Sequence, residues 1–420
     1  MKVDGPEGPD GPGGPVRRAA LFTATVTIWS VVTVGTAATV GCGGAEGGGT
    51  AVVRDSAGVT IVEYAERARD TLPWSIASQP LVEIGAVEGD EAYQLSSVSG
   101  VRRLSDGRIV IADEGTADLR IFDPTGRHLV TTGRKGEGPG EFEGLSGLFV
   151  GPGDTLLAYD SNVKRVSVFT PDGAFVRSFT VDFAQGVPVL VGRFADGSFL
   201  ATRAFTFVPS EIDEVVPDSQ PVYHFAADGA LMDSTGRWLA TEWYVHGTGG
   251  QTWAVSLPFG RRMVVAVAPA GFYVGSSGQY QVEWRDPAGT LRRILRITAS
   301  PRPVTGDDWE RAKAERMRNV PDQMRPRQER MLAELPVPST RPAFGALQTD
   351  PDGNLWVAHS VISADDPQPW TVFDSTGTML GLVTTPAGLS VREIGRDYIL
   401  GVARDELDVQ HVQLFVLEKQ

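Results

Sequence analysis

Residues 98–142 contain four short apolar runs, and their spacing constrains the fold more than any other feature of the chain. The first and third separators, SDG at 105–107 and DPTG at 123–126, place Gly, Asp and Pro where a tight hairpin needs them. Short apolar runs bounded by turn residues are typical of strands. We therefore predict a four-stranded antiparallel meander with strands over 98–104, 109–112, 119–122 and 129–132.

The same unit recurs along the chain in two aligned columns. The third run of each copy carries an aromatic residue: Phe122, Phe169, Phe225, Trp284, Phe373 and Phe415. The second runs (IVIA, LLAY, FLAT, FYVG, LWVA and YILG) begin at 109, 156, 199, 272, 355 and 398 and are almost continuously apolar. Such runs predict strands buried on both faces, as in sheets stacked around an axis. Six copies predict an all-β fold, a six-bladed β-propeller of four-stranded antiparallel blades.

The last copy, residues 389–417, has room for only three strands. Residues 81–85, followed by an acidic Gly-containing link, repeat the pattern of residues 129–133 and the link after them. We therefore expect 81–85 to supply the fourth strand of the last blade. Pairing the two ends of the chain in this way closes the ring and removes an open sheet edge.

The unit DGRIVIADEGTADLRIFDPTGRHLVTTG resembles NHL-type repeats, and the link GRKGEGPGEF is similar to that of bacterial six-bladed β-propeller lipoproteins. The resemblance covers about residues 81–420. It implies the propeller fold. Because that group of proteins is functionally heterogeneous, it implies no particular activity.

The N-terminal segment predicts export. Two arginines, Arg17 and Arg18, precede a weakly polar to apolar run that ends at the only cysteine, Cys42. The sequence TVGC resembles a bacterial lipoprotein signal, which implies lipidation of Cys42 and a membrane-anchored protein facing the periplasm or the cell surface. An uncleaved transmembrane anchor and a free structural cysteine are the alternatives. We predict a signal peptide over 1–41, a linker and N-terminal extension over 42–80, and the propeller over 81–420.

Three insertions interrupt the repeat, at 202–221, 236–260 and 305–338. The last is expected to be helical, because Thr305 and Asp308 can form a capping box and good helix formers follow. Prolines 321, 326 and 336 are expected to break it into pieces. Strand alternation places the two later insertions and the links between blades on one face, which we call the upper face. Elaboration of one face favours binding there.

Two groups on the upper face are candidate binding residues. Arg134 and Lys135 lie in a Gly-rich link whose backbone amides could hold an anion, although the glycines could simply let the chain cross between blades. Trp238, Trp243 and His246 could stack on a sugar ring or grip a peptide, or they could be buried by an extra hairpin.

The helical insertion is the third candidate region. Residues 302–330 carry eight basic and six acidic side chains, so they could cover the central opening and meet an acidic partner, or form a solvated flap. Upper-face positions at the ends of the second strands are Asp113, Asp160, Arg203, Ser276 and His359.

The functional prediction is a non-enzymatic binding or protein-interaction module, with a protein or carbohydrate as the ligand. The formal charge of −14 argues against nucleic acid. No HExxH or GxSxG motif occurs, and we assign no catalytic residue, cofactor or metal. The alternative is a metal-assisted hydrolase or lyase on the propeller axis, with the set Asp113, Asp160, Glu141 and His359. A structural envelope component without a small-molecule ligand is a third possibility.

Overall fold

The computed structural model describes residues 50–204, 214–248 and 251–419, without the side chains of 247–253. All these residues belong to the second of two compact units, residues 37–420. The predicted export signal and Cys42 lie outside the described residues. Within them, no helix has the length and apolar character needed to cross a membrane.

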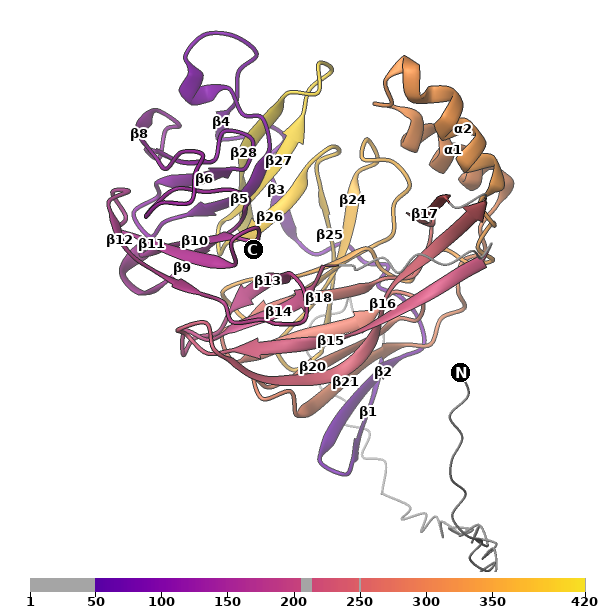
Figure 1. Cartoon of the computed structure of the whole chain (residues 1–420). Coiled ribbons are helices and arrows are strands. Elements are labelled where there is room, and N and C mark those ends of the chain that lie inside the picture. Colours follow the sequence, from indigo (N-terminus) through magenta and orange to yellow (C-terminus); the bar gives the residue numbers. More distant parts are fainter. Residues whose placement is uncertain (1–49, 205–213, 249–250, 420) are drawn as a thin grey trace, which may run out of the picture. The chain divides into compact units, whose positions relative to one another are not determined.

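The described strands form six sheets (Figure 1). The first blade contains β5 (Val98–Arg103), β6 (Ile109–Asp113), β7 (Asp118–Phe122) and β8 (His128–Thr132). The second contains β9 (Leu145–Val150), β10 (Leu156–Asp160), β11 (Arg165–Phe169) and β12 (Phe175–Thr180). The third contains β13 (Pro188–Arg193), β14 (Phe199–Arg203), β15 (Glu214–Phe225), β16 (Leu231–Thr248) and β17 (Gln251–Ser256).

The remaining three sheets complete the set. The fourth contains β18 (Met263–Ala268), β19 (Gly271–Ser276), β20 (Gln281–Arg285) and β21 (Leu291–Ile297), extended by β2 (Val59–Tyr64) and β1 (Ala51–Ser56). The fifth contains β22 (Ala346–Thr349), β23 (Leu355–Ala358), β24 (Gln368–Phe373) and β25 (Met379–Thr385). The sixth contains β26 (Ser390–Ile394), β27 (Tyr398–Arg404) and β28 (Gln410–Lys419), with β4 (Val82–Ile84) and β3 (Trp74–Ile76).

The first strands of the six sheets follow one another in a closed order. Contacts run from β5 to β9, β13, β18, β22 and β26, and β26 returns to β5. The predicted six-bladed β-propeller is therefore confirmed. All six aromatic residues of the repeat column lie on third strands, and all except Trp284 are buried.

The second strands are buried on both faces, as predicted. In β6, Ile109 and Ile111 pack with Leu400 of the sixth blade. The alternate residues Val110 and Ala112 pack in a cluster that includes second-blade residues. Burial of one such aliphatic side chain contributes about 1.5–3 kcal/mol to stability. The contacts between stacked blades therefore supply much of the stabilising free energy of the core.

The expected closing strand is confirmed. In the antiparallel pair of β4 and β28, Ile84 lies opposite Val412 and Val82 lies opposite Leu414. The same β28 also pairs with β3, where Leu417 lies opposite Ile76. Strands from near the two ends of the described chain thus share one sheet.

The repeat pattern predicts no strand before residue 81, but the structure forms a hairpin there. Strand β2 pairs in parallel with β21 and adds β1 as the outermost strand of the fourth sheet. Buried Tyr64 anchors this hairpin to the fifth blade, because its hydroxyl donates to Gly377 O (3.1 Å) and accepts from Met379 N (2.7 Å).

The third insertion is helical, with α1 (Gly306–Met317), a 3-10 turn over Asp322–Met324 and α2 (Arg325–Glu334). The capping box between Thr305 and Asp308 is present. The expectation that Pro326 breaks a helix is wrong: it lies in the first turn of α2, where its missing N–H has no helical partner to lose. The break falls between Met317 and Arg325.

The helices pack against the extended part of the third blade, and Figure 1 shows them near β17 and the far end of β16. Tyr244 and Leu257 form a small core with Trp309, Leu332 and Leu335. The second and third insertions therefore support each other.

Candidate functional site

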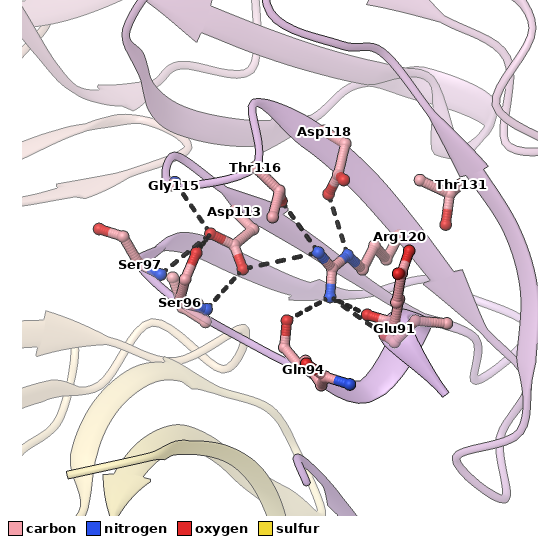
Figure 2. A network of polar contacts seen from close by, with 12 residues as sticks. Glu91, Gln94, Ser96, Ser97, Asp113, Gly115, Thr116, Asp118, Arg120 and Thr131 are labelled. Atoms are coloured by element: carbon pink, nitrogen blue, oxygen red, sulfur yellow. Dashed lines mark hydrogen bonds and ion pairs between the residues drawn. The ribbon is translucent and has the colours of Figure 1, made fainter. Parts of the chain in front are cut away.

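Asp113 and Asp160 join neighbouring chain segments by hydrogen bonds. Figure 2 shows the Asp113 carboxylate, which accepts from Ser96 N (2.9 Å), Ser97 N (2.9 Å) and Gly115 N (2.9 Å). Asp160 accepts from Glu143 N (2.6 Å) in the same way. Both carboxylates are buried. Each of the two carboxylates therefore holds the link that enters its own blade.

Two arginines that are not among the predicted site residues hold the same links. Arg120 donates from Nη1 to Glu91 O (3.1 Å) and Gln94 O (2.8 Å), and lies 3.9 Å from Asp113 (Figure 2). Arg165 donates to Glu137 O (2.6 Å) and Glu141 O (2.7 Å) in the second blade. In both blades the arginine lies at the start or in the middle of the third strand, and an acidic, Gly-containing link precedes the blade. This combination is the signal in the sequence that could have indicated the two arginines.

The Gly-rich link of Arg134 and Lys135 already contains an anion of its own. The Glu141 carboxylate accepts from Gly138 N (2.9 Å) and pairs with Arg134 (2.5 Å), and the Arg134 hydrogen bond holds the pKa of Glu141 below its usual value. Lys135 pairs with Glu143 at 3.0 Å. An external anion would have to displace Glu141 from this link.

The aromatic candidates come from different places on β16. Trp238 packs against the interface of the third and fourth blades, with the guanidinium of Arg285 5.1 Å from its ring centre. Trp243 is half-buried, and His246 Nδ1 lies 3.9 Å from a carboxylate oxygen of Glu334 in α2. Arg203 ends β14, next to residues outside the described ranges.

His359 follows β23 and lines a cavity on the upper face. Its Nε2 lies 2.9 Å from the Thr371 hydroxyl. Burial lowers the pKa of His359 to about 4, and the charges of Arg67 and Arg302 add to this effect. The ring is therefore neutral at pH 7.

The four residues of the predicted metal set come from the first, second and fifth blades, and the structure does not bring them together. Asp113 and Asp160 serve their own links, and Glu141 serves the Gly-rich link. In the part of the chain that the structure describes, no three His, Cys, Asp or Glu side chains gather as a candidate metal site.

The structure instead forms a cavity of about 410 Å³ between α1 and the fourth, fifth and sixth blades. Its lining includes Arg262, Arg316, Gln348, His359 and Val391. A second cavity, of about 1010 Å³, shares Arg316 with the first and reaches Arg392 and the loop after β27. Both lie on the upper face, because they are lined by the starts of first strands and the ends of second strands.

Three arginines of these cavities, Arg262, Arg316 and Arg392, form no ion pair with any described carboxylate. Arg262 donates to Gly345 O (2.9 Å), and Arg316 contacts Ser256 Oγ at 3.3 Å. Arg392 forms no side-chain hydrogen bond within the described residues. By contrast, Glu315 in the same lining is paired with Arg318 at 2.5 Å.

Burial lowers the pKa of all three arginines. Arg262 and Arg392 are nevertheless exposed, which fits side chains that line an open cavity within the protein. A guanidinium stays charged at neutral pH, so a lowered pKa reports an unfavourable environment for the positive charge. A bound anion would relieve it.

A third cavity, of about 390 Å³, lies at the other end of the axis and is lined by the first strands of all six blades. It shares Gln348 with the first cavity and Arg392 with the second. Arg102 and Arg193 also line it. Glu393 is its carboxylate, and burial raises the pKa of that group.

A comparison with known protein families agrees with the fold. The sequence model of the DUF5128 family, described as a 6-bladed beta-propeller, matches residues 86–214, which include the first two blades. A search of curated proteins gave no match.

Solved structures that align with this chain include a member of the DUF4221 family from Bacteroides vulgatus, at 11% identity and a TM-score of 0.48, covering 83% of this chain and 99% of that one. A candidate exported protein of Bacteroides fragilis aligns at 12% identity and 0.47, covering 86% and 99%. The virginiamycin B lyase of Staphylococcus aureus aligns at 9% and 0.40, covering 82% and 99%. Such identities transfer no activity. The closed ring of six sheets, together with the family match, identifies the chain as a six-bladed β-propeller.

Proposed function

We propose that this protein is an exported, lipid-anchored β-propeller that binds a small anionic ligand on its upper face, without catalysis. The observation that carries the proposal is the group Arg262, Arg316 and Arg392, three unpaired arginines around adjoining cavities beneath α1. Arg262 and Arg316 line the first cavity, where the one carboxylate of the lining, Glu315, is paired with Arg318. The second cavity also carries the carboxylates of Asp365, Asp405, Glu406 and Asp408, so the cationic part of the site lies towards the first cavity.

The chemistry of the lining indicates the ligand class. Guanidinium groups bind carboxylate, phosphate and sulfate through paired N–H donors. The first cavity is of a size suited to a small molecule and adds apolar walls from Leu257, Phe259 and Leu389. A compact ligand with an anionic end and an apolar or sugar-like body fits this combination.

Binding of citrate to the full chain, measured by isothermal titration calorimetry, tests the proposal. Each of the single substitutions Arg262→Met, Arg316→Met and Arg392→Met should weaken citrate binding roughly tenfold or more, because a charged hydrogen bond contributes about 1.5–3 kcal/mol. Arg327→Met is the matched control, since Arg327 is an exposed arginine of α2. If a variant with all three replacements binds citrate as the natural chain does, the proposed site is wrong.

A further inference from the structure

A second group of arginines lies where the helical insertion leaves and rejoins the propeller. Arg302 precedes the insertion and Arg341 follows it, and Arg341 N donates to Arg302 O at 2.8 Å. Arg67, from the segment after β2, donates to Ala343 O at 3.0 Å. Arg341 also donates from Nη2 to Ser360 O at 2.8 Å. These bonds join the insertion to the fifth blade and to the N-terminal segment.

Several donors of this group have no acceptor. Arg302 Nε and Nη2 and Arg341 Nε are buried and form no hydrogen bond with a described residue. The same holds for Tyr280 Oη, whose residue is 5% exposed. The Thr371 hydroxyl, which faces Tyr280, is engaged by His359 Nε2 at 2.9 Å and forms no hydrogen bond of normal geometry with Tyr280. Unsatisfied buried donors are rare in folded proteins, so a cluster of them indicates a missing partner.

The charges in the group are also unbalanced. Its counter-charge is Asp308, 3.8 Å from Arg341. Burial and the neighbouring Arg341 and Arg67 lower the pKa of Arg302. His359, which faces the same arginines, is neutral at pH 7 and neither adds to nor offsets their charge. Three guanidinium groups therefore share one carboxylate.

Buried water could accept hydrogen bonds from these donors, but it would leave the excess positive charge in place. A small anion would satisfy both requirements. We propose that Arg67, Arg302, Arg341 and Tyr280 form a second anion site, which takes a small inorganic anion such as a halide or phosphate. This site is separate from the ligand group Arg262, Arg316 and Arg392, and it fixes the base of the helical insertion over the cavities.

Crystals of the full chain grown in sodium bromide locate the site directly. We expect an anomalous bromide peak within hydrogen-bonding distance of the Arg302 guanidinium and Tyr280 Oη, and its replacement by a tetrahedral group in sodium phosphate. Density for water alone in both salts would overturn the proposal.

Thermal unfolding gives an independent test at constant ionic strength. Arg302→Met removes an unpaired charge, so in sodium gluconate it should unfold at or above the temperature of the natural chain. In sodium bromide the order should reverse, since only the natural chain gains stability from the bound anion. Arg302→Lys retains the charge and should keep part of the bromide response.

The exposed-site control Arg327→Met and the cavity variant Arg392→Met should both retain the full bromide response. A bromide response in Arg302→Met equal to that of the natural chain would contradict the assignment. Loss of the response in Arg392→Met would show that bromide acts at the upper cavities instead, which would also contradict it.

Discussion

Asp113 and Arg120 face each other at 3.9 Å in the first blade, and both direct their hydrogen bonds to the segment that enters that blade. The Asp113 carboxylate accepts from Ser96 and Ser97, while the Arg120 guanidinium donates to carbonyls of residues 91, 92 and 94. The pair thus fixes, through charged and buried contacts, a link whose regular structure is one short 3-10 helix, Glu91–Tyr93. Its function is structural.

Asp113→Asn should lower the free energy of unfolding by about 1–3 kcal/mol, because the neutral amide accepts the buried backbone N–H groups of the entering link less well than the carboxylate does. Arg120 keeps its ion pair with Asp118 at 3.0 Å. Urea unfolding followed by circular dichroism measures the change. Asp106→Asn is the control: it also removes a carboxylate from an arginine pair, that with Arg108, but Asp106 lies at an exposed turn. A loss below 1 kcal/mol for Asp113→Asn would contradict the role given to the pair. A double-mutant cycle with Arg120→Met would isolate the coupling between the two groups.

Closure of the ring depends on the short strand β4. Ile84 is fully buried and packs in a cluster that includes Val412 and Leu414 of β28, so Ile84→Ala should cost about 2–5 kcal/mol. It should also increase aggregation, since loss of β4 exposes the edge of the sixth sheet. Urea unfolding and light scattering measure the two effects. Leu81→Ala, at an exposed site just before β4, should leave both unchanged. Equal behaviour of the two variants would show that β4 is not needed for closure.

The fold could be predicted because its signals are local. Turn residues and third-strand aromatics recur in each unit, and the missing strand of the last blade has a recognisable copy at 81–85. The β1–β2 hairpin was not predicted, because its partner β21 lies far along the chain and already completes a four-stranded blade. No spacing in the sequence indicates that parallel pair.

The candidate site was harder to predict for a related reason. Arg262, Arg316 and Arg392 come from a link, a helix and a first strand, and only the ring order and the folded insertion bring them to adjoining cavities. The excess of basic residues in the insertion was the one available signal. Arg134 and Lys135, which a local motif favoured, are already paired within their own link.

Lipid attachment at Cys42 remains a prediction from the sequence. Growth of expressing bacteria with radiolabelled palmitate should label the natural chain, and Cys42→Ala should abolish the label and move the protein from the membrane to the soluble fraction. Cys42→Ala should not alter citrate binding, because the cavities lie in the propeller. Label retained in the alanine variant would exclude this cysteine as the attachment site.

His359 should make stability depend on pH. The pKa of His359 is lowered to about 4 in the folded protein from an ordinary value of 6.5, so the unfolded chain binds the proton first as the pH falls. The folded protein should therefore lose stability as the pH falls from about 6.5 towards about 4, by at most roughly 3 kcal/mol from this group at 1.36 kcal/mol per unit.

His359→Gln keeps a polar group near Thr371 but does not titrate. Comparison of its urea unfolding with that of the natural chain at pH 7.5, 6 and 5 isolates the histidine contribution, because the carboxylates titrate in both proteins. The variant should lose less stability on acidification. Parallel pH curves would show that His359 is not shielded from protonation in the folded state.

The helical insertion should open without unfolding of the propeller when its small core is disrupted. Trp309 of α1 packs with Tyr244, Leu257, Leu332 and Leu335, a cluster separate from the cores between blades. Trp309→Ala should cost about 3–5 kcal/mol within that cluster. Hydrogen exchange should then become fast in 306–334 and in the end of β16, while β6 and β10 keep their protection. Met324→Ala, at an exposed position of the same insertion, is the control.

Because Arg316 would leave the cavity when α1 opens, Trp309→Ala should also weaken citrate binding. Unchanged citrate binding in an opened insertion would show that α1 contributes nothing to the ligand site.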